Sequence, residues 1–169
     1  MTDAATLYDQ DFVTWTEQQA EALRAAARGG TNPRLDWENL AEEIESLGKS
    51  DRRELHRQTC RIVRHLAQLQ FSEAIEPRDG WRESIIDGRV QAELVLADSP
   101  SLKPQLAQII EHQTPKAMER AMSNLEKFGE LDRAAAEAMR QTRYTVDQVL
   151  GDWFPPDLAR SSGRGEKPE

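Results

Sequence analysis

The stretch Leu35–Leu55, LDWENLAEEIESLGKSDRREL, decides how we expect this chain to fold. Asp36 is a residue type that caps helix starts and Gly48 is a type that ends helices, so a short helix is predicted between them. Ser50 or Asp51 then caps a longer helix. The stretch therefore predicts a corner between two capped helices, and the side chains that we expect it to bury are Trp37, Leu40, Ile44, Leu47 and Leu55.

Apolar residues recur at spacings of three and four on both sides of this corner, which is the periodicity of amphipathic helices. The predicted stripes are Tyr8, Phe12, Trp15, Ala22 and Ala26; Leu55, Thr59, Ile62, Leu66 and Leu69; Trp81, Ile85, Ala92 and Val95; and Leu102, Leu106, Ile109 and Ile110. Gly88 indicates close packing or a bend, and Pro115 either kinks the last of these helices or restarts it. Thr145 and Gln148 predict a capping box near the C-terminus.

The sequence thus predicts an all-α, single-domain protein. We expect a mostly antiparallel bundle of five or six helices over residues 1–158 and a disordered, mobile tail over residues 159–169. The tail is predicted because it has no apolar residue that could anchor it to the bundle, whereas Trp153 and Phe154 are expected to fold back onto the core.

Composition excludes several classes of protein. The 169 residues are 38% hydrophobic and 31% charged, which is typical of a globular helical protein. No apolar run reaches the roughly 20 residues that span a bilayer, and the N-terminus lacks the basic and apolar regions of a secretory signal. One cysteine, Cys60, excludes an internal disulfide and fits a reducing compartment, so we expect a cytoplasmic protein with no membrane partner.

Two segments carry a resemblance to a known family: Tyr8-x-x-Asp11-Phe12-x-x-Trp15 and the run Asp36–Glu45, DWENLAEEIE. Together with Gly48-Lys49-Ser50, Trp81-Arg82 and Ser99-Pro100-Ser101-Leu102, they resemble the family catalogued as domain of unknown function twenty-nine, over roughly residues 6–155. Members of that family are abundant in cyanobacteria and occur in other bacteria. The resemblance implies an all-helical bacterial protein and implies no activity.

Residue types that carry catalysis or bind metals are present, but their spacing matches no known site. The chain has neither the Glu-x-x-His motif of di-iron bundles nor His-Glu-x-x-His, and a single cysteine cannot form a thiolate site. His56 and Cys60 share a helix face, whereas His65 points away from it and His112 lies on another helix. We therefore expect no metal and no cofactor, and we interpret Cys60 as a half-buried structural thiol.

Charged residues form two faces of opposite sign on the two helices of the corner. The acidic face is Glu38, Glu42 and Glu45, with Glu43 on the other flank; the basic face is Arg53, Arg57, Arg61 and Arg64. Each of these faces is most often a solvated helix surface. If they are functional, they are candidate interaction faces for a protein partner or for a second copy of the chain.

We therefore favour a non-enzymatic cytoplasmic interaction module that binds a protein partner or associates with itself. One alternative is an enzyme or small-ligand protein with a site between helices that uses Glu42, Glu43, His56 or His65. The other is a nucleic-acid binder that uses the arginine stripe Arg53, Arg57, Arg61 and Arg64. We place nucleic acid last, because the formal net charge is −8 and no aromatic residue interleaves with the arginines.

Overall fold

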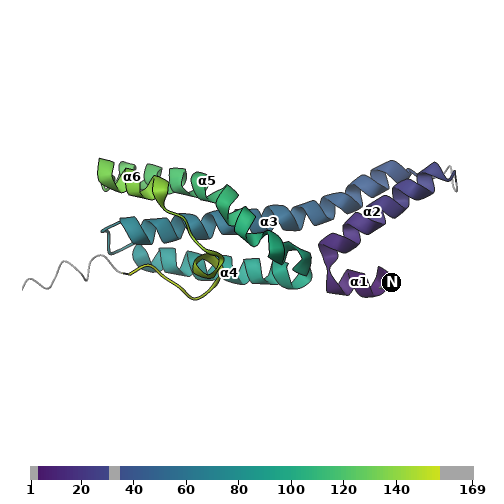
Figure 1. The fold of residues 1–169 in the computed structure, drawn as a ribbon, viewed down its shortest axis with the longest axis horizontal. Coiled ribbons are helices and arrows are strands. Elements are labelled where there is room, and N and C mark those ends of the chain that lie inside the picture. The colour runs from purple at the N-terminus through teal and green to yellow at the C-terminus, as the bar shows by residue number, and fades with distance from the viewer. Residues whose placement is uncertain (1–3, 31–34, 157–169) are drawn as a thin grey trace, which may run out of the picture. The chain divides into compact units, whose positions relative to one another are not determined.

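The computed structural model of the chain describes residues 4–30 and 35–156, and these residues form helices and no strands (Figure 1). The elements are α1 (Ala4–Gln10), α2 (Phe12–Arg28), α3 (Trp37–Phe71), α4 (Arg78–Asp98), the 3-10 helix η1 (Pro100–Gln105), α5 (Leu106–Lys127), α6 (Arg133–Gln141) and α7 (Val146–Leu150). The predicted all-α fold is confirmed. The expected mobile tail lies outside the described residues. Across the two described ranges, every helix is too short or too polar to span a bilayer.

Contacts between residues divide the chain into two compact units. The first unit holds residues 1–55 and 93–105, and the second unit holds residues 56–92 and 106–169. Helices α3 and α4 are each divided between the two units, because the boundaries fall after Leu55 and after Ala92. The single domain over residues 1–158 stays a prediction.

The predicted corner at Gly48 is wrong, because α3 runs without interruption for 35 residues (Figure 1). Asp36 does cap the start of α3, where its carboxylate accepts a hydrogen bond from the backbone nitrogen of Asn39. Gly48, however, has no positive φ and is buried within the helix. A Cβ atom at this position would overlap Oγ1 of Thr16 in α2. The glycine therefore serves close helix packing and does not end a helix.

Helix α2 runs antiparallel to the part of α3 in the first unit. Arg24 near the end of α2 pairs with Glu45 at 2.6 Å, whereas Glu17 near its start pairs with Arg52 at 2.6 Å. Several fully buried residues of the two helices are small, namely Thr16, Ala20 and Ala41. This register turns the predicted core residues Leu40 and Leu47 outward, with 42% and 51% of their surfaces exposed, so the prediction that they are buried is wrong.

The predicted first helix is in fact two helices that meet at Asp11. The backbone of Asp11 is extended, with φ −158° and ψ 95°, and its carboxylate accepts a hydrogen bond from the backbone nitrogen of Thr14. Asp11 is thus the N-cap of α2, a role in which aspartate competes with helix continuation. As a result Val13, Thr16 and Ala20 form the buried side of α2.

The second unit holds the main hydrophobic core, which α3, α4 and α5 build with the C-terminal helices. Its fully buried members include Ile62, Leu66, Leu69, Ile85 and Met139. A Cβ atom on Gly88 would lie 2.8 Å from Cγ1 of Ile62, so the predicted close packing at this glycine is confirmed. Pro115 lies inside α5, which continues through it.

The ends of the C-terminal helices are held by specific hydrogen bonds. Helix α5 ends at Lys127, and Gly129 two residues later has φ +73°. The backbone nitrogen of Glu130 then donates to the carbonyl of Leu125 and closes the helix end. The predicted capping box of Thr145 and Gln148 is confirmed. Arg89 donates to the carbonyls of Gln148, Val149 and Trp153 and lies 4.8 Å from the ring centre of Phe154, so the aromatic pair folds back as predicted.

Substitution of Gly48 tests its packing role. We expect Gly48→Ala to lower the free energy of unfolding by about 1–3 kcal/mol, because the methyl group must displace Thr16. The matched control is Gly80→Ala, since a Cβ on this helical glycine meets no atom within 4 Å and gains up to about 1 kcal/mol of helix propensity. Urea unfolding measures both. Equal stability of the two variants would refute the packing role.

His65 gives the second unit a pH-dependent stability. Burial, and then the neighbouring Arg64, lower the pKa of His65 to about 4, below the value of about 6.5 for an unfolded histidine. The unfolded state therefore binds a proton first as the pH falls. Stability from this group is present above pH 6.5 and is lost between pH 6.5 and pH 4.

Between pH 7 and pH 4 we expect the free energy of unfolding to fall by about 3 kcal/mol more for the wild type than for His65→Gln. Glutamine is chosen because it keeps an acceptor for Arg64. Urea unfolding at several pH values measures this difference. Parallel pH profiles for the two proteins would show that His65 is not the group responsible.

Candidate functional site

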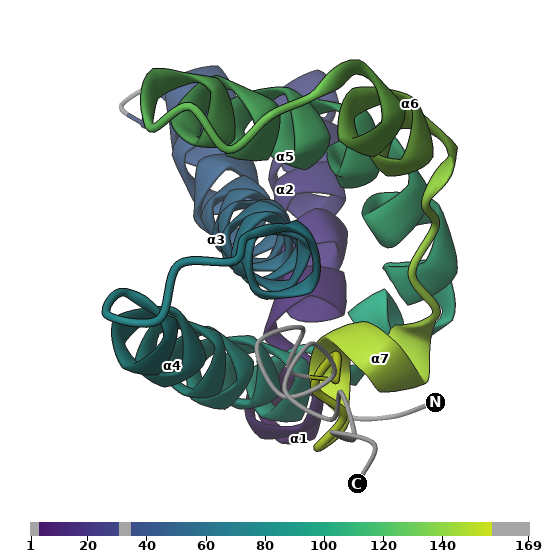
Figure 2. The ribbon, with the colours of Figure 1, turned by 90° about the vertical axis from the view of Figure 1, so that its left-hand side faces the viewer.

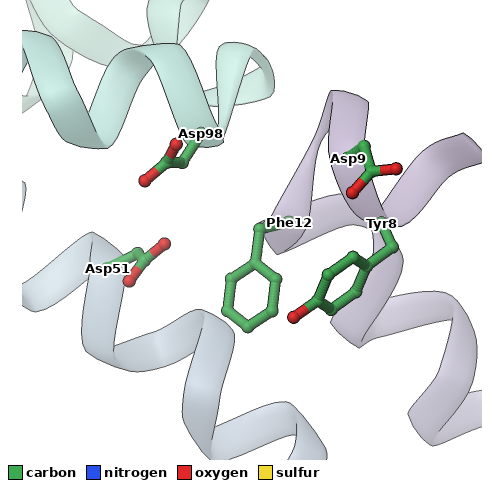
Figure 3. A pocket seen from close by; sticks show the side chains of 5 residues that line it. All are labelled: Tyr8, Asp9, Phe12, Asp51 and Asp98. Carbon is green, nitrogen blue, oxygen red and sulfur yellow. The ribbon is translucent and has the colours of Figure 1, made fainter.

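A pocket of about 400 Å³ lies within the first unit, lined by Tyr8, Asp9, Phe12, Asp51 and Asp98. The carboxylates of Asp51, from α3, and Asp98, from the end of α4, lie on one side of it, and the rings of Phe12 and Tyr8 lie across from them (Figure 3). Asp9 completes the lining from α1. The pocket thus combines three acidic side chains with two aromatic walls.

The aromatic walls are positioned by the break between α1 and α2. Tyr8 precedes the capping residue Asp11 and Phe12 follows it, so the corner brings both rings to one side. Their centres lie 5.7 Å apart at an interplanar angle of 84°, and Trp15 contacts both rings, at 4.8 Å from Tyr8 and 5.9 Å from Phe12. Edge-to-face contacts of this kind fix ring orientation. The walls are therefore preformed.

Two serines connect the α1–α2 corner to the end of α4. Asp11 accepts hydrogen bonds from the backbone nitrogen and the hydroxyl of Ser101, at 2.6 and 2.9 Å. Ser99 Oγ accepts from the backbone nitrogen of Val13 at 3.2 Å and donates to Asp51 at 3.4 Å. Burial by itself would raise the pKa of Asp11, but the hydrogen bonds from Thr14 and Ser101 outweigh it and lower the pKa.

The next feature of the pocket is the charge balance of its carboxylates. Among the residues that the structure describes, none of Asp9, Asp51 and Asp98 forms an ion pair. Burial raises the pKa of Asp51, and the charge of Asp98 raises it further, against the opposing hydrogen bond from Ser99. A cation between the two carboxylates would remove this repulsion, and the electron-rich ring faces attract cations as well.

The acids of the pocket are not arranged to chelate a metal. In the described part of the chain, no three His, Cys, Asp or Glu side chains come together as a metal site requires. The carboxylates are spread around a space of about 400 Å³ that aromatic rings share. Such a space accommodates an extended organic cation, such as an ammonium group on an alkyl stem or a guanidinium group.

The predicted acidic face is largely engaged inside the first unit. Glu38 lies 3.6 Å from Arg24, and Glu45 pairs with both Arg24 and Lys49. The hydrogen bonds from Lys49 and then Arg24 lower the pKa of Glu45 to about 2. Glu42 is exposed, as is Glu43 on the other flank. The face therefore ties α2 to α3 through two of its three members and leaves Glu42 in water.

The predicted basic face is divided between the units. Arg53 is exposed in the first unit, and Arg57, Arg61 and Arg64 belong to the second unit, where Arg57 is exposed. Arg64 is partly buried, and burial followed by the charges of Arg120 and Arg61 lowers its pKa, with an opposing effect of Cys60. Its Nη2 donates to Nε2 of His65 at 2.8 Å, so this histidine is a neutral acceptor.

The histidines and the cysteine do not line the acidic pocket. The side-chain amide of Gln113 donates to Nδ1 of His56 at 2.9 Å and to Nδ1 of His112 at 3.1 Å. Burial and then His112 lower the pKa of His56. Cys60 is buried in the second unit's core rather than half-buried, which corrects the expectation for this thiol. This arrangement is typical of neutral, structurally paired histidines.

Sequence reasoning missed every acid of the pocket, because its members come from three distant segments. Tyr8 and Phe12 were assigned to a core stripe, and Asp51 was treated only as a possible helix cap. Asp98 is 47 residues from Asp51 in the chain, and no local pattern indicates that they meet. The one available signal was the pair Ser99 and Ser101, whose hydroxyl groups follow Asp98 directly.

Comparison with known proteins places the chain in a family. An α-helical protein of unknown function from Rhodospirillum rubrum has a similar solved structure, with a TM-score of 0.69 and 25% sequence identity over 87% of this chain and 90% of that chain. A search of curated proteins finds no match. The family described as Domain of unknown function DUF29 matches residues 7–154. The chain therefore belongs to the DUF29 family.

Proposed function

We propose that this protein is a non-enzymatic interaction module of the bacterial cytoplasm whose first unit binds a basic segment of a partner protein. The observation that carries the proposal is the pocket of Asp9, Asp51 and Asp98, which has aromatic walls and forms no ion pair with the described residues of its own chain. A lysine or arginine side chain of the partner fills this space. The single cysteine supports a reducing compartment, and the similar structure comes from a bacterium.

The charge of the first unit supports a basic partner. Its described residues include 13 acidic and 6 basic side chains, whereas those of the second unit include 13 acidic and 12 basic ones. Nearly all of the net negative charge of the described residues, −7 in the first unit against −1 in the second, therefore lies on the unit that holds the pocket. A field of one sign raises the association rate of an oppositely charged partner and rejects partners of like charge.

An apolar ridge leads along α3 to the pocket. Leu47 lies one helical turn before Asp51 on the same face, and Leu40 lies two turns before Leu47. Both leucines are exposed. A partner segment with apolar residues and one basic residue therefore finds contact area on the ridge and an ion pair at its end, which is the usual combination at a protein interface.

The two alternative functions lack comparable support. Glu42 and Glu43 are exposed in the first unit, His56 accepts a hydrogen bond from Gln113, and His65 contacts Arg64. None of these four side chains lines the acidic pocket, the pocket of about 580 Å³ beside Trp81 or the small pocket beside Gly48. In the sequence no aromatic residue interleaves with the arginine stripe, whereas sites for single-stranded nucleic acid use such residues to stack on bases. We therefore favour recognition of a protein over catalysis and over nucleic-acid binding.

Neutralising the paired acids tests the pocket. We expect Asp51→Asn combined with Asp98→Asn to weaken binding of a fluorescent hexa-arginine peptide by about tenfold, since roughly 1.4 kcal/mol of ion-pair energy is lost. The control variant, Glu42→Gln with Glu93→Gln, removes two charges of the same unit outside the pocket and is expected to change affinity less than about twofold. Fluorescence anisotropy at physiological salt measures both.

Three outcomes of this titration would contradict the proposal. Equal weakening in the two variants would show that the peptide responds only to the overall negative charge of the unit. Absence of binding to the wild type would show that the pocket is not a cation site. The third outcome is tight self-association that masks the pocket, which light scattering of the free protein reveals as a dimer that hexa-arginine does not dissociate.

The same substitution makes a prediction about stability. Because burial and Asp98 raise the pKa of Asp51, its charged form is unfavourable in the folded protein at pH 7. We therefore expect Asp51→Asn to have a melting temperature equal to or above that of the wild type while it binds the peptide more weakly. A clear drop in melting temperature would mean that the carboxylate serves the fold rather than a ligand.

A further inference from the structure

The exposed side of α3 in the first unit alternates leucines with carboxylates. Its members follow one another at spacings of three, four and four residues and therefore share one helix face: Leu40, Glu43, Leu47 and Asp51. Leu40 and Leu47 are 42% and 51% exposed, and Glu43 is exposed as well. Asp51, at the end of the row, lines the acidic pocket. We call these four residues the leucine–acid row.

Helix α2 packs against a different side of α3. Gly48 is buried on that side, where a Cβ atom would overlap Oγ1 of Thr16. Successive residues of a helix are rotated by about 100°, so Gly48 and Leu47 point in clearly different directions. The row therefore borders the contact with α2 without being covered by it, which leaves its two leucines exposed along one face.

The carboxylates of the row are not neutralised by the described part of the chain. Among the described residues, neither Glu43 nor Asp51 forms an ion pair. Lys49 and Arg52 pair with acids outside the row, and Arg53 lies about 120° around the helix from the row. A partner that neutralises the row therefore carries basic residues.

The spacing of the row matches a helical partner. With a rise of about 1.5 Å per residue, Leu40 and Leu47 lie about 10.5 Å apart along α3, and the whole row is about 16.5 Å long. Residues seven apart in a second α-helix repeat at the same interval of about 10.5 Å, so one face of it meets all four members. Four side chains on one face of an extended segment span about 20 Å and overrun the row.

We propose that the leucine–acid row binds an amphipathic helix of a partner protein, in which basic and apolar residues alternate along one face. This inference rests on the proposed function, because Asp51 belongs to both the row and the acidic pocket. The partner helix runs antiparallel to α3, since this orientation brings the negative C-terminal end of its dipole to the positive N-terminus of α3 at Trp37. Its basic residues then meet Asp51 and Glu43, and its apolar residues meet the two leucines.

A designed peptide provides the probe. It has about 20 residues, mainly alanine and glutamine, with two lysines eight residues apart, one leucine four residues after the first lysine and one leucine three residues after the second. A control peptide of the same composition has its lysines on the side of the helix opposite the leucines. We expect the wild type to bind the first peptide about fivefold more tightly, because only this peptide places lysines and leucines on the row together. Fluorescence anisotropy at physiological salt measures both.

Single variants separate the row from its surroundings. Leu47→Ala should weaken the designed peptide about fivefold through lost apolar contact, whereas Ile86→Ala, at an equally 51% exposed position of the second unit, should leave its affinity unchanged. Glu43→Gln should weaken it about threefold. The neighbouring substitution Glu42→Gln removes the same charge from an exposed residue off the row and should have no effect.

An exchange of charges tests the orientation. Glu43→Lys should weaken the designed peptide about tenfold, and a peptide with glutamate in place of the second lysine should recover most of the affinity. Glutamate in place of the first lysine gives the same net charge but meets Asp51, so it should recover none. Recovery by the first position alone would refute the antiparallel orientation, and recovery by neither would refute the pairing.

Hexa-arginine separates this inference from the function on which it rests, because it has no leucine and Leu47→Ala should not change its affinity. If the wild type binds hexa-arginine but does not distinguish the two peptides, the helix proposal fails and the cation pocket stands. If hexa-arginine does not bind while the designed peptide binds in a manner that depends on Leu47 and Glu43, the pocket fails and the row stands.

Two further results would overturn the helix proposal. One is a dimer of the free protein that Leu47→Ala dissociates in light scattering, since a second copy of the chain would then occupy the row. The other is an equal loss of affinity in Glu43→Gln and Glu42→Gln, which would leave only general attraction to the unit. All of the substituted positions are exposed, so each variant is expected to fold, and circular dichroism verifies this before the titrations.

Discussion

The contact between Gly48 and Thr16 is the constraint on which the first unit depends. Because Gly48 has no side chain, α2 approaches α3 closely, with Thr16, Ala20 and Ala41 fully buried. This register sets the start of α2 beside Ser99, whose hydroxyl accepts from Val13 and donates to Asp51. One small residue in the middle of a long helix thus determines where the acidic pocket forms.

The segments that mark the chain as a DUF29 protein meet at this point. Asp11 caps α2 and accepts hydrogen bonds from Ser101, while Tyr8 and Phe12 on either side of it line the pocket (Figure 3). In the structure these residues cap a helix, connect two segments and line the pocket. This arrangement supports the proposed recognition of a ligand in a preformed space.

Local chemistry made much of the fold predictable, and distant contacts made the rest unpredictable. The caps at Asp36 and Thr145 were found because a cap is read from a few neighbouring residues. Gly48 was misread because a glycine that ends a helix and one that admits a neighbouring helix look alike in sequence. The exposure of Leu40 and Leu47 followed from that error, since the partner of α3 decides which of its faces is buried.

The two units offer chemically different spaces. Figure 2 shows α4, α5, α6 and α7 around the end of α3 that belongs to the second unit, and a pocket of this unit is lined by Trp81, Leu125 and Phe128. The first unit's pocket is acidic and has aromatic walls. Neither was visible in the sequence, because the pairs Asp51 with Asp98 and Gln68 with Phe128 are each far apart in the chain.

We propose above that Asp51 and Asp98 of the first unit bind a cationic side chain of a partner. Titration of the Asp51 carboxyl group tests this proposal most directly. Carbon-detected NMR of the side-chain carboxyl groups gives its pKa with and without saturating hexa-arginine. The account predicts a pKa above the ordinary value of 3.8 in the free protein and a fall when the peptide binds. A pKa at or below 3.8 that the peptide leaves unchanged would contradict it.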